Sequence, residues 1–164
     1  MATRSTPQML KILAGGALSL CLLGAFAHPF GQVKRVSNAG PLLAGADIDS
    51  HMEALLERSC QNCHSERTTW PWYSYVPPAS WMIERDVRDA RLHMNFSQWG
   101  AYSAERREAM LGIVAAAVRN QQMPPGRYTA LHPGAVLSNS EREEIYRWAR
   151  GERRRMARAV DTVR

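Results

Sequence analysis

The pentapeptide Cys60-Gln61-Asn62-Cys63-His64 constrains this chain more than any other feature of its sequence. Two thiols separated by two residues can each add to one vinyl group of the same porphyrin, which leaves the following imidazole beside the iron. A zinc site would need two more ligands at short spacing, and the only other cysteine, Cys21, lies in an apolar N-terminal run. A thioredoxin-like pair would open a helix after a strand, whereas this pair is expected near a helix end. The motif therefore predicts one haem c per chain, attached through Cys60 and Cys63, with His64 on the iron.

The N-terminal segment has the composition of an export signal. Arg4 and Lys11 supply positive charge, residues 12–25 are apolar, and Ala25-Phe26-Ala27 has the small-x-small pattern of a cleavage site. This pattern predicts a signal peptide over residues 1–27. The alternative is an uncleaved membrane anchor, since the apolar run can be extended to Phe30. Either version predicts a periplasmic domain, soluble after cleavage or anchored in the inner membrane.

The remaining length allows one compact domain. We expect a linker over residues 28–46, a haem-binding domain over 47–150 and a basic C-terminal extension over 151–164. The formal charge of +6 does not imply a nucleic-acid partner, because much of the excess consists of arginines in the last segment. Such a run is typical of a solvated helix end, with a docking patch for an acidic partner or anionic lipid as the alternative.

Helical signals recur along the mature chain. Ser50 and Glu53 form a capping-box pattern before Met52, Leu55 and Leu56, and this periodicity continues into the cysteine motif. Further helices are expected after Ser80, over residues 81–93, and after Ser103. A last helix is expected after the capping-box pair Ser138 and Glu141. The expected inward residues are Ala109, Met110, Ile113, Val114, Ala117 and Val118 in the third helix, and Ile145, Trp148 and Ala149 in the last.

No alternating apolar run is long enough for a pair of β-strands. Residues 68–81 are rich in Trp, Tyr and Pro, which excludes a regular helix there and suits a loop that packs a small core. The sequence therefore predicts an all-α, cytochrome c-like helical domain around one haem.

The ligand opposite His64 decides what the haem can do. Met123 is the preferred candidate, because Pro124 and Pro125 follow it and fix an extended loop that can project a thioether. His93, Met94 and His132 remain alternatives. The helical positions of Met82 and Met110 favour a place in the core for both. A thioether stabilises ferrous iron relative to a second imidazole and leaves no open site, so we expect single-electron transfer.

The order of helix, C-x-x-C-H, intervening helices, Met-Pro loop and capped last helix resembles class I c-type cytochromes. More closely, the chain resembles the bacterial haem-binding domain family of small exported proteins. The residues that carry this resemblance are Cys60 to Ser65, Thr69-Trp70-Pro71-Trp72-Tyr73-Ser74, Ser80-Trp81, Arg91, Asn95-Phe96-Ser97, Trp99, Met123-Pro124-Pro125 through Tyr128, His132-Pro133, Leu137-Ser138 and Trp148. The resemblance implies haem attachment at Cys60 and Cys63, with His64 and Met123 as iron ligands. It also implies that a proline carbonyl, of Pro77 or Pro78, orients the His64 ring.

These observations predict an exported monohaem c-type cytochrome that exchanges single electrons with a redox protein, which can itself be membrane-bound. A haem-based sensor or ligand-binding module is one alternative, and the electron-transfer subunit of a redox enzyme is another. No catalytic constellation of side chains is visible, so the sequence favours an electron carrier over an enzyme.

Overall fold

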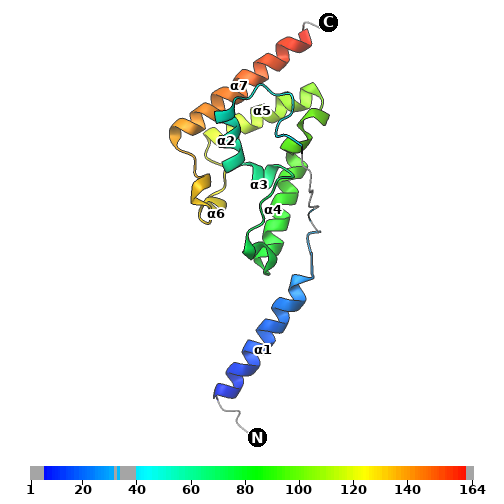
Figure 1. Ribbon diagram of the computed structural model, residues 1–164, viewed down its shortest axis with the longest axis vertical. Coiled ribbons are helices and arrows are strands. Elements are labelled where there is room, and N and C mark those ends of the chain that lie inside the picture. The colour runs from blue at the N-terminus through cyan, green and yellow to red at the C-terminus, as the bar shows by residue number, and fades with distance from the viewer. Residues whose placement is uncertain (1–5, 32, 34–39, 162–164) are drawn as a thin grey trace. The chain divides into compact units, whose positions relative to one another are not determined.

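The computed structural model describes residues 6–31, 33 and 40–161. Every regular element in that part of the chain is a helix, which confirms the all-α prediction (Figure 1). The expectations for Arg4, Arg164 and residues 32 and 34–39 of the predicted linker lie outside the described residues. The helices are α1 Thr6–Ala25, α2 Ser50–Ser59, α3 Gln61–His64, α4 Ala79–His93, α5 Ala104–Arg119, α6 Gly126–Thr129 and α7 Asn139–Asp161, with 3-10 turns η1 Trp72–Tyr75, η2 Phe96–Ala101 and η3 Pro133–Ala135.

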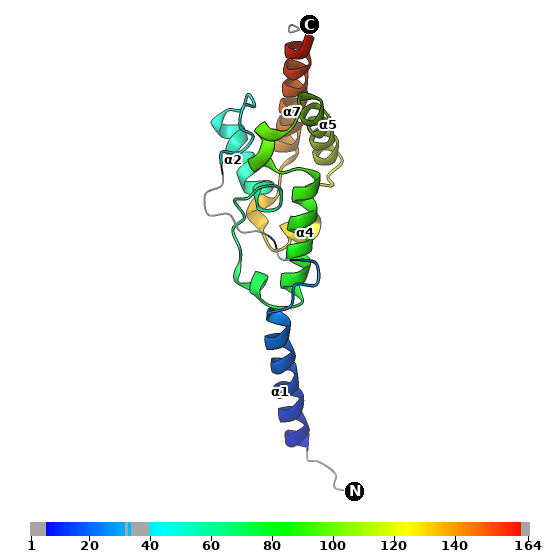
Figure 2. The same ribbon diagram turned by 90° about the vertical axis from the view of Figure 1, so that its right-hand side faces the viewer.

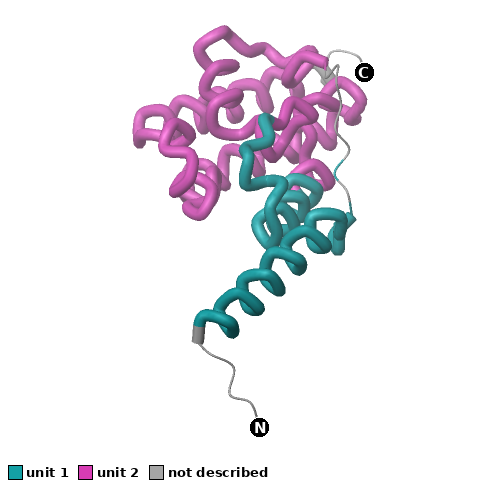
Figure 3. The backbone as a smooth tube through the Cα atoms, turned by 60° about the horizontal axis from the view of Figure 1, so that its bottom comes forward, with its two compact units in different colours: residues 1–34, 69–89 teal, residues 35–68, 90–164 magenta. Residues whose placement is uncertain are grey.

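The chain divides into two compact units (Figure 3). Unit 1 comprises residues 1–34 and 69–89, and unit 2 comprises residues 35–68 and 90–164. The cysteine motif, Met123 and the other candidate iron ligands all belong to unit 2. Helix α7 continues without interruption past residue 150, where a separate basic extension is predicted to begin.

Unit 2 is held together by one hydrophobic cluster in which helices α5 and α7 lie side by side (Figure 2). Trp99 from η2, Leu56 from α2, Leu111 from α5 and Ile145 from α7 are almost completely buried in it. Burying a side chain of this size contributes roughly 1.5–3 kcal/mol, so the cluster is the main source of stability for unit 2.

Part of the predicted linker belongs to this core. Leu42 and Leu43 are both buried in the cluster, and the Leu43 backbone N–H donates a hydrogen bond to the Phe96 carbonyl at 3.0 Å. Two adjacent leucines can face one core because Leu43 adopts a left-handed conformation, with φ of 52°. The Gly and Pro content of residues 28–46 is typical of a linker. The adjacent leucines Leu42 and Leu43 are the feature of this segment that indicates a place in the core.

The third helix begins where the sequence predicts, because the Ser103 side chain accepts a hydrogen bond from the Arg106 N–H. Its buried stripe is rotated from the expected one. Met110, Val114 and Val118 are buried as predicted, but Ile113 is 65% exposed. Leu111 and Ala115 are buried in its place, and Ala109 is also exposed. Helix α7 covers only one side of α5. The predicted stripe therefore included Ile113, which lies outside the covered side, and left out Leu111 and Ala115, which lie within it.

Two other helices begin earlier than expected. The N-cap of α2 is Asp49, whose carboxylate accepts a hydrogen bond from the Met52 N–H at 2.7 Å, so Ser50 lies inside the helix. Helix α4 begins at Ala79, which places Ser80 within the helix and buries it. Met82, expected in the core, is exposed.

Helix α7 begins with the predicted capping box. The Glu141 carboxylate accepts a hydrogen bond from the Ser138 N–H at 2.7 Å, and the Glu141 N–H donates to Ser138 Oγ at 3.2 Å. The Arg58 guanidinium also contacts the Glu141 carboxylate at 2.6 Å. The backbone hydrogen bond from Ser138, with smaller contributions from Arg58, lowers the pKa of Glu141.

Replacing Glu141 with glutamine is expected to destabilise unit 2 by about 1 kcal/mol at neutral pH. A lowered folded-state pKa means that this contribution is complete above the unfolded pKa of about 4.3 and disappears as the pH falls through the folded value. Urea unfolding at pH 7 and pH 3 measures the difference. The matched control is Glu143→Gln, since Glu143 meets Arg147 only at 3.9 Å on an exposed face. A destabilisation that is equal at both pH values would contradict the assignment.

Candidate functional site

The cysteine motif occupies a separate helical turn rather than the end of the preceding helix. Helix α2 ends at Ser59, and Cys60 leaves helical geometry with φ of −126° and ψ of −36°. The Cys63 and His64 N–H groups both donate to the Cys60 carbonyl, at 3.2 and 3.0 Å, which closes the turn α3. This break corrects the expectation of one continuous helix. It still brings both thiols and the imidazole onto one turn, because the spacing of three and four residues matches a helical turn.

Neither cysteine of the motif forms a disulfide, and both are half-buried. Burial is the main reason that the pKa of Cys60 rises to about 11, and the nearby Cys63 adds to the effect. Cys60 is therefore a neutral thiol at physiological pH. Such a thiol is a poor nucleophile and a poor partner for a free metal ion, since both roles require the thiolate. Addition across a vinyl double bond consumes the thiol as it stands, with sulfur joining one carbon and hydrogen the other.

The His64 ring is oriented through one of its two nitrogens. Its Nδ1–H donates a hydrogen bond to the Met94 backbone carbonyl at 3.1 Å, and the ring stacks on Phe96 with centroids 5.8 Å apart. Burial lowers the pKa of His64, so the neutral imidazole is favoured. The hydrogen bond at Nδ1 leaves the lone pair on Nε2, which is the arrangement expected of an axial iron ligand.

The carbonyl that orients His64 therefore differs from the predicted one. A proline carbonyl about a dozen residues after the histidine, at Pro77 or Pro78, was expected to fill this role. The structure assigns it to Met94, at the end of α4. Helix α4 ends at His93, so no backbone N–H of a following helical turn donates to the Met94 carbonyl. This carbonyl can therefore accept the hydrogen bond from the imidazole.

The half-buried Arg91 side chain is hydrogen-bonded to the segment that follows the motif. Arg91 donates from Nε to the Ser65 carbonyl at 2.9 Å and from Nη2 to Thr68 Oγ1 at 3.0 Å. Thr68 in turn donates to the Asn62 carbonyl at 2.7 Å. Burial lowers the pKa of Arg91, although the Glu66 and Cys63 side chains oppose the shift. The sequence marked Arg91 only through a family resemblance, since nothing in a linear pattern shows that it reaches back to the motif.

Met123 is placed by the way in which α5 ends. Gln121 adopts a left-handed conformation with φ of 58°, and the Gln122 N–H donates to the Ala117 carbonyl at 2.9 Å. This is the hydrogen-bond pattern of a Schellman motif. The Met123 N–H also approaches the Ala117 carbonyl, at 3.3 Å. The backbone of Met123 is thus fixed to α5, whereas its side chain is 37% exposed.

The Met123 loop is tied to the cysteine motif by side-chain hydrogen bonds. Asn62, between the two cysteines, donates from Nδ2 to the Tyr128 hydroxyl at 2.9 Å. The Tyr128 ring stacks on His132 with centroids 4.1 Å apart. Further along, Arg58 donates to the carbonyls of Gly134 and Val136, at 2.7 and 3.0 Å. The sequence missed this role of Asn62, which lies at one of the two variable positions of the motif.

The other candidate ligands occupy different environments. The Met94 side chain is buried in the hydrophobic cluster, and its carbonyl is already bonded to His64. His132 stacks on Tyr128, and its Nδ1–H donates to the Tyr128 carbonyl at 2.9 Å. His93 is exposed at the end of α4. Within the described ranges, no group of three or more His, Cys, Asp or Glu side chains is arranged to hold a metal ion by itself.

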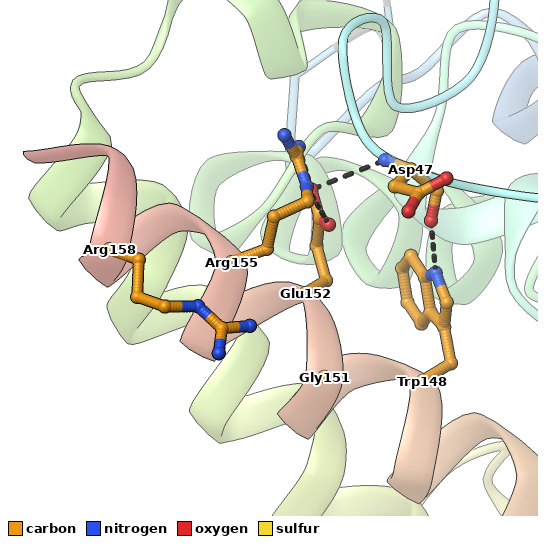
Figure 4. A pocket seen from close by; sticks show the side chains of 6 residues that line it. All are labelled: Asp47, Trp148, Gly151, Glu152, Arg155 and Arg158. Carbon is orange, nitrogen blue, oxygen red and sulfur yellow. Dashed lines mark hydrogen bonds and ion pairs between the residues drawn. The ribbon is translucent and has the colours of Figure 1, made fainter. Parts of the chain in front are cut away.

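A separate small pocket in unit 2 is structural in character (Figure 4). Trp148 Nε1–H donates to the Asp47 carbonyl at 2.8 Å, and the buried Glu152 carboxylate accepts from the Asp47 N–H at 3.3 Å. Arg155 pairs with Glu152 through two contacts of 2.6 Å. These contacts fasten the chain before α2 to α7.

Comparisons with known proteins address the site as a whole. A family model described as a haem-binding domain matches residues 20–151. A cytochrome c peroxidase of Escherichia coli (strain K12) is 27% identical over 156 residues, which cover 92% of this chain and 33% of the relative. The chain thus spans about a third of the length of this curated relative. No solved structure shows significant similarity.

The peroxidase relative corrects one expectation from the sequence. The absence of a visible catalytic constellation favoured an electron carrier over an enzyme, but the relative is named as an enzyme. The prediction that the chain has no enzymatic role is therefore wrong. The reason is chemical: a haem supplies the reactive group of a haem enzyme, so side-chain constellations need not mark it.

Proposed function

The chain belongs to the haem-binding domain family, and we propose that it holds one haem c and passes single electrons in peroxidase-type chemistry. The observation that carries this proposal is the turn from Cys60 through α3, which brings two thiols together with an imidazole whose Nδ1–H is bonded to the Met94 carbonyl. This donor set fits a covalently attached haem, which Cys60 and Cys63 would hold through thioether bonds and His64 through Nε2. A bound haem supplies a one-electron ferric–ferrous couple.

Met123 is proposed as the second axial ligand. Its backbone is anchored to α5, its loop is hydrogen-bonded to the motif through Tyr128 and Asn62, and its thioether is accessible. Burial of Met94 in the core and the ring stacking of His132 argue against these two of the three alternatives. Because a thioether favours ferrous iron, this ligation suits an electron donor of relatively high potential.

The similarity to a peroxidase supports hydrogen peroxide as the final acceptor of those electrons. Reduction of hydrogen peroxide to two waters consumes two electrons and two protons, so a one-electron haem must deliver its electron to a peroxide-reducing centre that collects two. We propose a redox protein partner for this step and an exported, periplasmic location for the domain. The whole relative is about three times the length that this chain matches, which leaves room in that protein for further centres.

Redox spectroscopy of the matured chain tests this proposal. The expected result is a one-electron titration, a long-wavelength ferric band of sulfur ligation, and a ferrous spectrum that carbon monoxide does not change. The reduced chain, mixed with its membrane fraction and hydrogen peroxide, is expected to reoxidise at two chains per peroxide. A ferrous spectrum that shifts with carbon monoxide would favour the ligand-binding alternative. Failure to reoxidise would remove the link to peroxide.

Replacing Tyr128 with phenylalanine is expected to loosen the Met123 loop while leaving the haem attached. The lost hydrogen bond from Asn62 contributes about 1 kcal/mol, so exogenous imidazole should bind the ferric haem about fivefold more tightly. Titration of the ferric spectrum with imidazole measures this. The matched control is Tyr146→Phe, which removes a hydroxyl that accepts from Arg150 on the exposed side of α7. Equal imidazole affinity in both variants would show that the Tyr128 hydroxyl does not hold the loop.

A further inference from the structure

Helix α1 is long and apolar enough to cross a membrane. Its apolar span covers 19 residues, Pro7–Ala25, and all of them except Gly24 are exposed. At 1.5 Å per residue it is about 28 Å long, close to the hydrocarbon thickness of about 30 Å. Length and composition alone do not separate a retained anchor from a signal peptide that is removed, so the distinction depends on what α1 contacts.

The end of α1 is built into unit 1. Trp81 of α4 donates from Nε1 to the Ala27 carbonyl at 2.8 Å and to the Gly24 carbonyl at 3.2 Å. A Cβ atom at Gly24 would lie 3.1 Å from Pro77 and 3.2 Å from Trp81, which is tighter than ordinary van der Waals contact, so glycine suits this close approach. The carbonyl of Ala27 belongs to the peptide bond that the small-x-small pattern marks for cleavage. In the folded unit, that bond is held by Trp81.

The residues after this peptide bond are held by α4 as well. His28 pairs with the buried carboxylate of Glu84 at 2.9 Å. Arg88 donates to the Phe30 carbonyl, and the Arg85 guanidinium lies over the Phe30 ring at 5.8 Å. The described residues on both sides of the predicted cleavage point therefore belong to one packed structure. Removal of residues 1–27 would take away two hydrogen-bond acceptors of Trp81 and the glycine packed against it.

Unit 1 also exposes large apolar side chains outside α1. Trp72 is 78% exposed and Phe26 is 85% exposed, and Tyr75, Val76 and Met82 are exposed with them. We call these five residues the apolar set. They come from the residue after α1, from η1 with the residue after it, and from the start of α4, all of which belong to unit 1. Trp and Tyr are enriched where membrane hydrocarbon meets water, because their rings are apolar and their N–H or O–H groups are polar.

We propose that unit 1 is a membrane-interface module. Helix α1 is retained as a spanning anchor, and the apolar set lies in the headgroup region of the same bilayer. The exposed Arg85 suits this region because cationic side chains are attracted to anionic headgroups, whereas Arg88 is already paired with Asp89 at 2.9 Å. Trp81 and the Glu84–His28 pair fix the end of the anchor to α4. The module thereby makes a second contact with the membrane, in addition to α1.

The experiment uses the full haem-loaded chain purified from membranes. Its intact mass gives the first residue, and a lipid-phase carbene reagent then labels it in vesicles of phosphatidylcholine and phosphatidylglycerol. We expect an N-terminus upstream of residue 7, with labelling of α1 and of residues 72–82. Ile113 and Leu131 of unit 2 are the matched controls, since each is 65% exposed, and they are expected to stay unlabelled.

A double variant makes the result independent of α1. Trp72→Ser with Tyr75→Ser is expected to lower labelling of residues 72–82 severalfold and to leave labelling of α1 and the haem spectrum unchanged. A mature chain that begins at His28 would overturn the retained anchor. Labelling of residues 72–82 that does not exceed that of Ile113 would overturn the interface contact, including the case in which a second copy of the chain covers the apolar set.

Discussion

Replacing Met123 with alanine is expected to leave the haem attached and to open one axial position on the iron. The thioether stabilises ferrous iron, so its loss should lower the reduction potential on the order of 0.1 V, within the roughly 0.8 V that axial ligands span. The ferrous variant should bind carbon monoxide, and the ferric band of sulfur ligation should disappear. Potentiometric titration and absorption spectra with carbon monoxide measure all three changes.

Met94→Leu is the matched control for this variant. Leucine keeps about the same volume in the core, and the backbone carbonyl that accepts from His64 remains in place. The spectrum and potential should therefore stay close to those of the wild type. If Met94→Leu opened the axial position and Met123→Ala did not, the sixth ligand would be Met94, and the role proposed for the Met123 loop would be wrong.

Replacing Cys63 with alanine is expected to abolish stable covalent attachment of the haem. Only Cys60 would remain, and without the second thiol the porphyrin has one point of attachment fewer and is no longer positioned on the turn for a stable thioether. A haem stain of a denaturing gel should fall to background, although the chain itself accumulates. Peptide mapping by mass spectrometry identifies any sulfur that still carries haem.

Cys21→Ala is the control for the cysteine variants. Cys21 lies in α1, exposed and remote from the motif in sequence, so its removal should leave the stained band unchanged. Full staining of the Cys63→Ala protein would mean that the haem is held through some other residue. Loss of staining in Cys21→Ala would mean that the N-terminal segment takes part in attachment.

Local signals in the sequence predicted the helices well where a helix end depends on its own side chains. Ser103 and the Ser138–Glu141 pair cap their helices as expected, because each cap is a contact within four residues. The same local logic selected Ser50 over Asp49, since both precede an apolar stripe and only the backbone conformation decides between them. The end of α2 before Cys60 could not be predicted either, because the helical spacing of apolar residues continues through the cysteine motif.

Contacts between residues far apart in the sequence account for most of the other differences between the sequence predictions and the structure. The carbonyl that orients His64 comes from Met94, thirty residues along the chain, and no linear spacing rule identifies it. Ile113 and Met82 have helical positions typical of a core, but burial depends on which neighbouring element covers that face. The cysteine motif was readable for the opposite reason, since two thiols and an imidazole must lie within one turn to serve one porphyrin.

The mass of the exported chain, purified and unfolded, tests the central claim most directly. The account predicts that the chain carries the added mass of one haem, that the peptide containing residues 60–64 holds it through both Cys60 and Cys63, and that neither thiol can be alkylated. An unmodified mass, with both thiols open to alkylation in the mature exported protein, would contradict covalent haem attachment and the proposed function that depends on it.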